Sequence, residues 1–118
     1  MFKPRKFKLR AEDLVDLLGR SMGSGIASDR ITVDGHSVGY MYREVPDNDI
    51  DSGWRFFAGD EAQDYADDPD HWAIYDLNTI ANCDRAIIPY LESGYGTKLE
   101  RVAGSSEFRR TSSEGLDA

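Results

Sequence analysis

Residues 53–84 read GWRFFAGDEAQDYADDPDHWAIYDLNTIANCD, a stretch dense in aromatic, aspartate and asparagine side chains. Its first apolar run, residues 54–57, predicts a strand that places Trp54 and Phe56 on one face of a sheet. Arg55 then lies on the opposite face. Because Arg55 is a lone base in a long acidic region, we expect it to pair with an aspartate and organise the fold.

Two further signals follow in the same stretch. Residues 67–70, Asp-Asp-Pro-Asp, predict a turn that stops a helix, since proline cannot continue one. Residues 74–82 are expected to begin as a strand and to continue as a helical turn. Asp76 or Asn78 is the expected N-cap of that turn, because a short polar side chain accepts hydrogen bonds from the exposed backbone N–H groups.

Upstream, two apolar runs flank the Asp-Gly pair at residues 34–35. Asp-Gly tolerates the positive φ that tight hairpin turns need, so the sequence predicts a β-hairpin at about residues 31–42. Alternation along its second strand puts Val38, Tyr40 and Tyr42 on one face.

The remaining segments predict short elements. Residues 11–18 carry a broad apolar face, acids in the first turn and a glycine after the last turn, which favours a short helix. Residues 21–28 are rich in glycine and serine and favour a loop. The expected fold class is therefore α+β, a small antiparallel sheet with short helices packed on one side.

Length and composition bound the class of protein. A chain of 118 residues has room for one core, so we expect a single domain at residues 1–110 and a mobile tail at 111–118. The sequence shows no apolar run that could cross a bilayer and no signal-peptide pattern, and we expect no membrane partner. Cys83 is the single cysteine, so no intrachain disulfide forms, and the cytoplasm is the expected compartment.

Charge restricts the possible partners. The formal net charge is −8, and between Glu44 and Asp84 the only base is Arg55. A field of this sign repels nucleic-acid phosphates and attracts basic partners, so we expect no nucleic-acid partner. The alternative is that the acidity only keeps the protein soluble. The sequence does not specify an oligomeric state.

Motifs that could carry catalysis or bind a metal lack the context they need. Residues 19–23 match the G-x-S-x-G of serine hydrolases, but this chain is too short for the parallel sheet that the motif requires. Residues 47–51 begin like a calcium loop but lack its glycine and its closing glutamate. His36, His71 and Cys83 are not spaced as zinc ligands, and no pair of carboxylates is placed across a cleft. The sequence predicts no catalytic residue, metal site or cofactor.

Three blocks of the sequence resemble, in order and at family-like spacing, a family of short bacterial domains long catalogued as of unknown function. They are ITVDGHSVGYMYRE at 31–44, DSGWRFFAGDE at 51–61 and IYDLNTIAN at 74–82. The likeness covers roughly residues 26–102. Members of this family are grouped with the immunity proteins of bacterial polymorphic toxin systems.

The resemblance implies a non-enzymatic protein that binds and neutralises a cognate toxin domain. Its motif residues, structural or functional, are Trp54, Arg55, Tyr75, Asp76, Asn78 and Asn82. Together with the charge, the resemblance leads us to expect a partner-binding surface that is acidic and aromatic. That surface comprises Asp60, Glu61, Asp64, Asp67, Asp68, Asp70 and Trp72. The alternative is a stand-alone regulatory or ligand-binding domain with no toxin partner.

Overall fold

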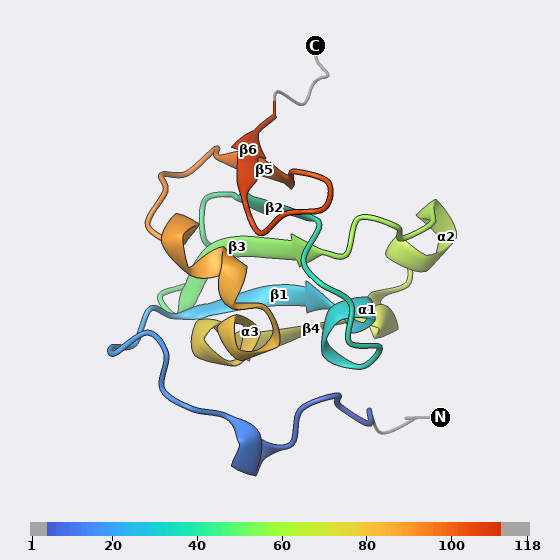
Figure 1. The fold of residues 1–118 in the computed structure, drawn as a ribbon, viewed down its shortest axis with the longest axis horizontal. Helices are drawn as coiled ribbons and strands as arrows, with labels where there is room; N and C mark the ends of the chain where they lie inside the picture. Colours follow the sequence, from blue (N-terminus) through green and yellow to red (C-terminus); the bar gives the residue numbers. More distant parts are fainter. Residues whose placement is uncertain (1–4, 112–118) are drawn as a thin grey trace.

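The computed structural model describes residues 5–111 and has the α+β arrangement that the sequence predicts (Figure 1). The expected tail at 111–118 falls, apart from its first residue, outside the described residues. No helix in the described part of the chain is long and apolar enough to span a membrane. In chain order the elements are η1 (Ala11–Asp13), β1 (Ser24–Ser28), α1 (Asp29–Thr32), β2 (Tyr40–Arg43), β3 (Asp51–Phe57), α2 (Gln63–Ala66), η2 (Pro69–His71), β4 (Trp72–Asp76), α3 (Leu77–Cys83), η3 (Arg85–Tyr90), β5 (Lys98–Arg101) and β6 (Phe108–Arg110).

The strands form one six-stranded sheet in the order β4-β1-β3-β2-β5-β6. Neighbouring strands pair antiparallel except β1 and β3, which run parallel. The expectation of an antiparallel sheet is therefore corrected to a mixed one. The parallel pair arises because β1 is inserted between β3 and β4, strands that come later in the chain.

Within the segment expected to be a loop, 21–28, residues 24–28 in fact form the strand β1, inside the sheet. Its small residues meet a packing demand. A Cβ atom added at Gly25 would lie 3.0 Å from the side chain of Leu77 and 3.1 Å from that of Phe56. Small side chains here let α3 pack closely on the sheet, a requirement that local composition does not reveal.

The predicted hairpin at about 31–42 is wrong, because its first strand is the helix α1. The Ser28 hydroxyl accepts a hydrogen bond from the backbone N–H of Arg30 and caps the helix start. Gly35 has φ of 84° and follows the end of the helix, where a left-handed residue lets the chain turn back. Positive φ suits a helix end as well as a hairpin. The prediction that Val38 shares a face with Tyr40 is also wrong. Val38 is fully buried in the core, on the other side of the sheet from Tyr40.

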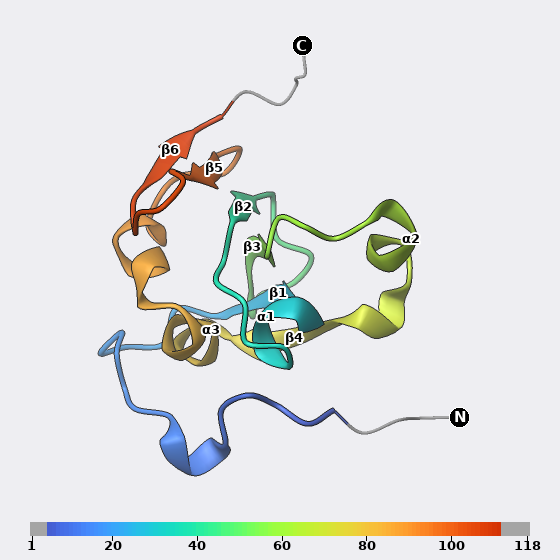
Figure 2. The same cartoon turned by 45° about the vertical axis from the view of Figure 1, so that its right-hand side comes forward.

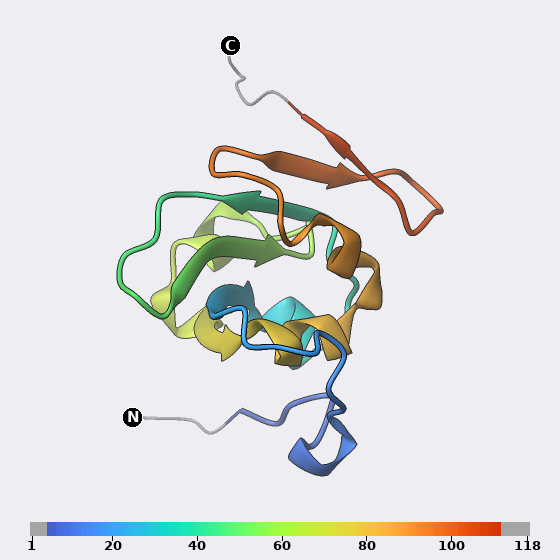
Figure 3. The ribbon, with the colours of Figure 1, turned by 90° about the vertical axis from the view of Figure 1, so that its left-hand side faces the viewer.

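The helix predicted at residues 11–18 is reduced to the single turn η1. The chain from residue 5 to residue 18, which we call the N-terminal strap, runs past α1 and α3 (blue in Figures 1 and 3). Side chains of α3 bind its backbone in place of helical hydrogen bonds. Asn78 Oδ1 accepts from the N–H of Leu17 at 2.8 Å, and Asn82 Oδ1 accepts from that of Val15 at 3.1 Å.

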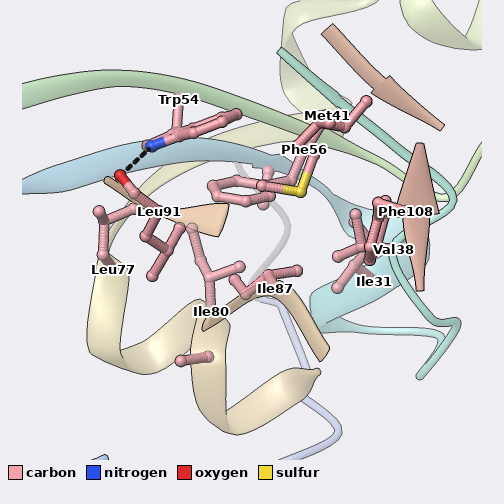
Figure 4. Packing of buried hydrophobic residues seen from close by; sticks show 13 residues of the cluster. Ile31, Val38, Met41, Trp54, Phe56, Leu77, Ile80, Ile87, Leu91 and Phe108 are labelled. Carbon is pink, nitrogen blue, oxygen red and sulfur yellow. Dashed lines mark hydrogen bonds between the residues drawn. The ribbon is translucent and has the colours of Figure 1, made fainter. Parts of the chain in front are cut away.

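The hydrophobic core lies between the sheet and the layer formed by α1, α3 and η3 (Figure 3). The alternation predicted for β3 is confirmed, because Trp54 and Phe56 are fully buried and face α3 and η3. Trp54 also donates its indole N–H to the carbonyl of Leu91 at 2.9 Å (Figure 4). The core residues are Ala27, Ile31, Val38, Met41, Trp54, Phe56, Leu77, Ile80, Ala81, Ile87, Leu91, Leu99 and Phe108.

Candidate partner-binding surface

The expected acidic surface forms a projection from the end of β3, and we call residues 60–70 the acidic arm. It contains α2 and most of η2 and leads back into the edge strand β4. Figure 2 shows α2 projecting on the side of the sheet away from α3. The short helical turns follow from the sequence, because the proline after Asp68 begins η2 and prevents α2 from continuing.

Two carboxylates at the base of the acidic arm bind groups of the protein itself. Asp60 receives two hydrogen bonds from the guanidinium of Arg30, at 2.6 Å and 3.2 Å, and this pairing lowers the pKa of the Asp60 carboxyl. Glu61 accepts from the backbone N–H groups of Ala58 and Gly59 at 2.8 Å and 2.9 Å. These contacts fix the direction in which the acidic arm leaves the sheet.

Farther out, the acidic arm presents carboxylates to solvent. Asp64, Asp67 and Asp70 are exposed, and Asp67 accepts a hydrogen bond from Gln63. Asp68 is half-buried and caps η2 by accepting from the N–H of Asp70 at 2.9 Å. The predicted residues are thus brought together on one projection, with a gradient from paired carboxylates at the base to exposed carboxylates at the tip.

Trp72 anchors the returning end of the acidic arm. Its indole N–H donates to the carbonyl of Ala66 at 3.0 Å, and its ring meets the ring of Phe57 edge-on at 4.9 Å between centroids. Tyr65 stacks on His71 at 3.8 Å. The acidic arm is therefore a preformed structure stabilised by aromatic contacts.

Arg55 organises a second acidic region beside the sheet. Its guanidinium binds both oxygens of Asp51 at 2.8 Å and donates to Glu44 at 2.7 Å, which confirms the predicted pairing with an aspartate. Hydrogen bonds from Arg55 lower the pKa of the Asp51 carboxyl and, in return, Asp51 raises the pKa of Arg55. Asp51, one of the three aspartates in the segment that resembles the start of a calcium loop, therefore binds Arg55. No group of three or more histidine, cysteine, aspartate and glutamate side chains is arranged to hold a metal within residues 5–111.

The other motif residues make contacts that build the fold. Asp76 caps α3 by accepting from the N–H of Asn78 at 2.9 Å, which confirms one of the two predicted caps. Asn78 and Asn82 each donate to the carbonyl of Val15 in the N-terminal strap. Tyr75 hydrogen-bonds Thr32 at 3.1 Å on the core side.

A pocket of about 190 Å³ lies under the N-terminal strap. Cys83 is half-buried there, and burial raises the pKa of its thiol. The residues that line the pocket are Phe7, Leu9, Ala11, Leu14, Thr32, Tyr75, Thr79 and Cys83. This volume is below the roughly 300–1,000 Å³ typical of small-molecule sites.

The sequence prediction missed a group of aromatic side chains on the sheet face opposite the core, which we call the outer face. Tyr40 and Phe57 are cross-strand partners, and Tyr42 lies 5.9 Å from Phe57 between ring centroids. The period of two in Tyr-Met-Tyr at 40–42 and Arg-Phe-Phe at 55–57 carried the signal. The predicted hairpin, however, paired residues 40–42 with residues 31–33 and not with β3.

Comparison with known proteins supports the resemblance. The family model described as the Immunity protein Imm33 domain matches residues 25–112, close to the range 26–102 over which the sequence blocks resemble such a family. No match was found among curated proteins or among solved structures. Because the match spans most of the chain, this protein belongs to the Imm33 immunity protein domain family.

Proposed function

We propose that this protein is a non-enzymatic, cytoplasmic immunity protein that neutralises a cognate toxin domain through the acidic arm and Trp72. Membership of an immunity protein family implies a toxin partner in general terms. The observation that carries the proposal is the exposed, preformed acidic arm. Its aspartates Asp64, Asp67 and Asp70 face solvent while aromatic contacts hold the backbone in place.

Inhibition by binding requires a rigid surface of the right charge. A surface that is already ordered loses little conformational freedom when a partner binds, so more of the contact energy appears as affinity. Exposed aspartates accelerate the encounter with a basic partner, because long-range attraction raises association rates. Asp60 contributes less to this field, since its charge is already paired with Arg30.

A rescue assay tests the proposal. Candidate toxin domains encoded by genes that neighbour this one are each expressed in a naive bacterium with and without this protein, and surviving cells are counted. We expect restored growth. The triple change of Asp64, Asp67 and Asp70 to asparagine should slow association about 3- to 10-fold at low salt and flatten its dependence on salt.

A matched control changes the same amount of charge elsewhere. Glu12, Glu92 and Glu107 are exposed and lie outside the acidic arm, and their change to glutamine raises the net charge by the same three units. Association of this control should stay close to that of the wild type. Equal slowing of both variants would show that net charge alone acts, and no change in either would remove the acidic arm from the mechanism.

The second candidate is the stand-alone ligand-binding domain, and its candidate site is the small, mainly apolar pocket under the N-terminal strap. In that case a small apolar molecule occupies the pocket, Thr79→Leu narrows the pocket and abolishes binding of that molecule, and the wild type gives no rescue from the toxin. An immunity protein that acts through the acidic arm keeps full rescue with the same variant, because Thr79 lines the pocket beneath the strap and is no part of the arm. The two functions therefore separate in one assay.

A further inference from the structure

The outer face carries a row of aromatic and aliphatic side chains contributed by three strands, β2, β3 and β4. Tyr40 and Phe57 pack at 5.6 Å between ring centroids, and Phe57 meets Trp72 at 4.9 Å. Tyr42 joins the row through Phe57. Ile74 extends it along the edge strand β4 and is 69% exposed.

The fold leaves this row open to solvent. The helices α1 and α3 pack against the sheet from the core side. Within the described residues, α2 and η2 are the helical turns on the other side, and both lie at the margin of the row in the acidic arm (Figure 2). Tyr40, Tyr42, Phe57 and Trp72 are each half-buried, so their rings are fixed by neighbours while one side remains accessible.

Acidic side chains surround this open row on several sides. Glu100 faces Tyr40 in the register between β2 and β5 and pairs with Arg109 at 3.5 Å. Glu44 binds Arg55, the cross-strand partner of Tyr42. Between residues 44 and 70 the chain has ten acids and one base. The acids are Glu44, Asp47, Asp49, Asp51, Asp60, Glu61, Asp64, Asp67, Asp68 and Asp70. Lys98, the cross-strand partner of Tyr42, is the base that β5 contributes to this side.

We propose that the aromatic row Tyr40, Tyr42, Phe57, Trp72 and Ile74 is the centre of the toxin-binding interface, and that it takes an arginine- or lysine-rich protein surface. This inference rests on the proposed function and locates the contacts that hold the partner, whereas the acidic arm attracts it. Rigid tyrosine and tryptophan rings dominate binding energy at the centre of interfaces.

Charge complementarity determines the class of occupant. Tyrosine rings accept the aliphatic stems and cationic heads of arginine and lysine side chains, and the surrounding carboxylates favour the same cations. A second copy of this protein would bring an equally acidic surface against the first, which repulsion opposes. The geometry therefore points to a basic partner and against self-association.

Binding to the purified toxin domain identified in the rescue assay tests the inference. Tyr42→Ala should weaken binding about 30-fold or more, mainly by faster dissociation, whereas Tyr42→Phe, which keeps the ring, should stay within about threefold of the wild type. Tyr95→Ala is the matched control. Tyr95 is 59% exposed and stacks on Arg43, which alternates with Tyr42 and faces the core side.

A second variant avoids the risk of misfolding. Ile74→Lys changes an exposed side chain, adds a positive charge to the row and should weaken binding at least tenfold. Val15→Lys, at a half-exposed residue of the N-terminal strap, supplies the matched control and should bind normally. Sedimentation of the free protein before and after the Ile74 change checks for self-association.

The outcomes separate this inference from the proposed function. A wild-type protein that neither binds nor rescues overturns both. Normal binding by folded Tyr42→Ala and Ile74→Lys, with weaker binding by the acidic-arm variant, overturns the aromatic row and leaves the proposed function in place. A dimer of the free protein that Ile74→Lys converts to monomer also overturns it, since the row would then be a contact between copies.

Discussion

Arg55 shows how a single buried charge organises the surface around it. Its side chain is 5% exposed, and its guanidinium is satisfied by Asp51, Glu44 and the carbonyl of Trp54. A planar guanidinium suits this role, because it binds one carboxylate with two parallel hydrogen bonds and retains donors for others. The loop between β2 and β3 is thereby tied to the outer face.

Replacing Asp51 with asparagine should destabilise the protein by about 2–4 kcal/mol, because Arg55 would stay buried without its main counter-charge. Urea denaturation at pH 7 measures this loss. Asp49→Asn, at an exposed neighbour, serves as the control and should change stability by less than about 0.5 kcal/mol. An equal loss in both variants would contradict the special role of the Arg55 pair.

The same pair predicts a dependence on pH. In the folded protein the pKa of Asp51 is lowered below its unfolded value of about 3.9, so its stabilisation is complete above that value. It is lost as the pH falls toward the folded pKa. The stability difference between wild type and Asp51→Asn should therefore shrink between about pH 5 and pH 2, and a constant difference would rule out this linkage.

At the scale of elements, the pairing of β2 with β3 depends on one glycine. Gly53 has φ of 91°, and a Cβ atom placed there would lie 2.0 Å from the carbonyl oxygen of Glu44. The backbones approach closely because the N–H of Glu44 donates to the carbonyl of Gly53 at 3.0 Å. A side chain at this position is excluded both by its own conformation and by the neighbouring strand.

Gly53→Ala should therefore destabilise the protein by about 2–4 kcal/mol, or prevent folding. Gly94→Ala is the control, since nothing lies within 4 Å of its added Cβ and its φ is not in the left-handed region. Thermal melts of the two variants measure the contrast. Comparable melting temperatures would show that the strands move apart to accommodate a methyl group.

Elements whose signals are local were predictable, and elements that depend on distant partners were not. The strand at 54–57 and the helix capped by Asp76 follow from alternation and from a capping side chain. The strand β1 was not predicted, because its small residues are required by close contacts with Leu77 and Phe56, which lie far along the chain. The prediction of a helix at 11–18 was wrong because Asn78 and Asn82 bind backbone N–H and carbonyl groups that a helix would have paired with each other.

At the scale of the whole molecule, one core connects residues from β1 to β6. The expectation of a single domain stays a prediction, and unfolding tests it. Fluorescence of the two tryptophans, Trp54 and Trp72, and far-ultraviolet circular dichroism should report the same midpoint in urea, because one hydrophobic cluster joins the elements. Two distinct midpoints would show that the chain unfolds as more than one unit.

The candidate site was predictable in its charge but not in its centre. The acidic residues of the acidic arm lie in one short stretch of sequence, 60–70, so composition alone identifies them. The aromatic row combines β2, β3 and β4, and it emerges only when strand order and register are known. Alternation placed Tyr40 and Tyr42 on one face, which the structure confirms, but their packing against Phe57 depends on the pairing of β2 with β3.

The position of β1 has a consequence for how the chain folds during its synthesis. β1 leaves the ribosome early, yet its partners are β3 and, later still, β4 at residues 72–76. Until those residues have emerged, an inner strand has both edges unpaired, and long-range pairing of this kind makes folding slow, on the order of milliseconds to seconds. A chain whose synthesis stops before residue 72 therefore lacks the antiparallel partner of β1 and should not reach the native fold.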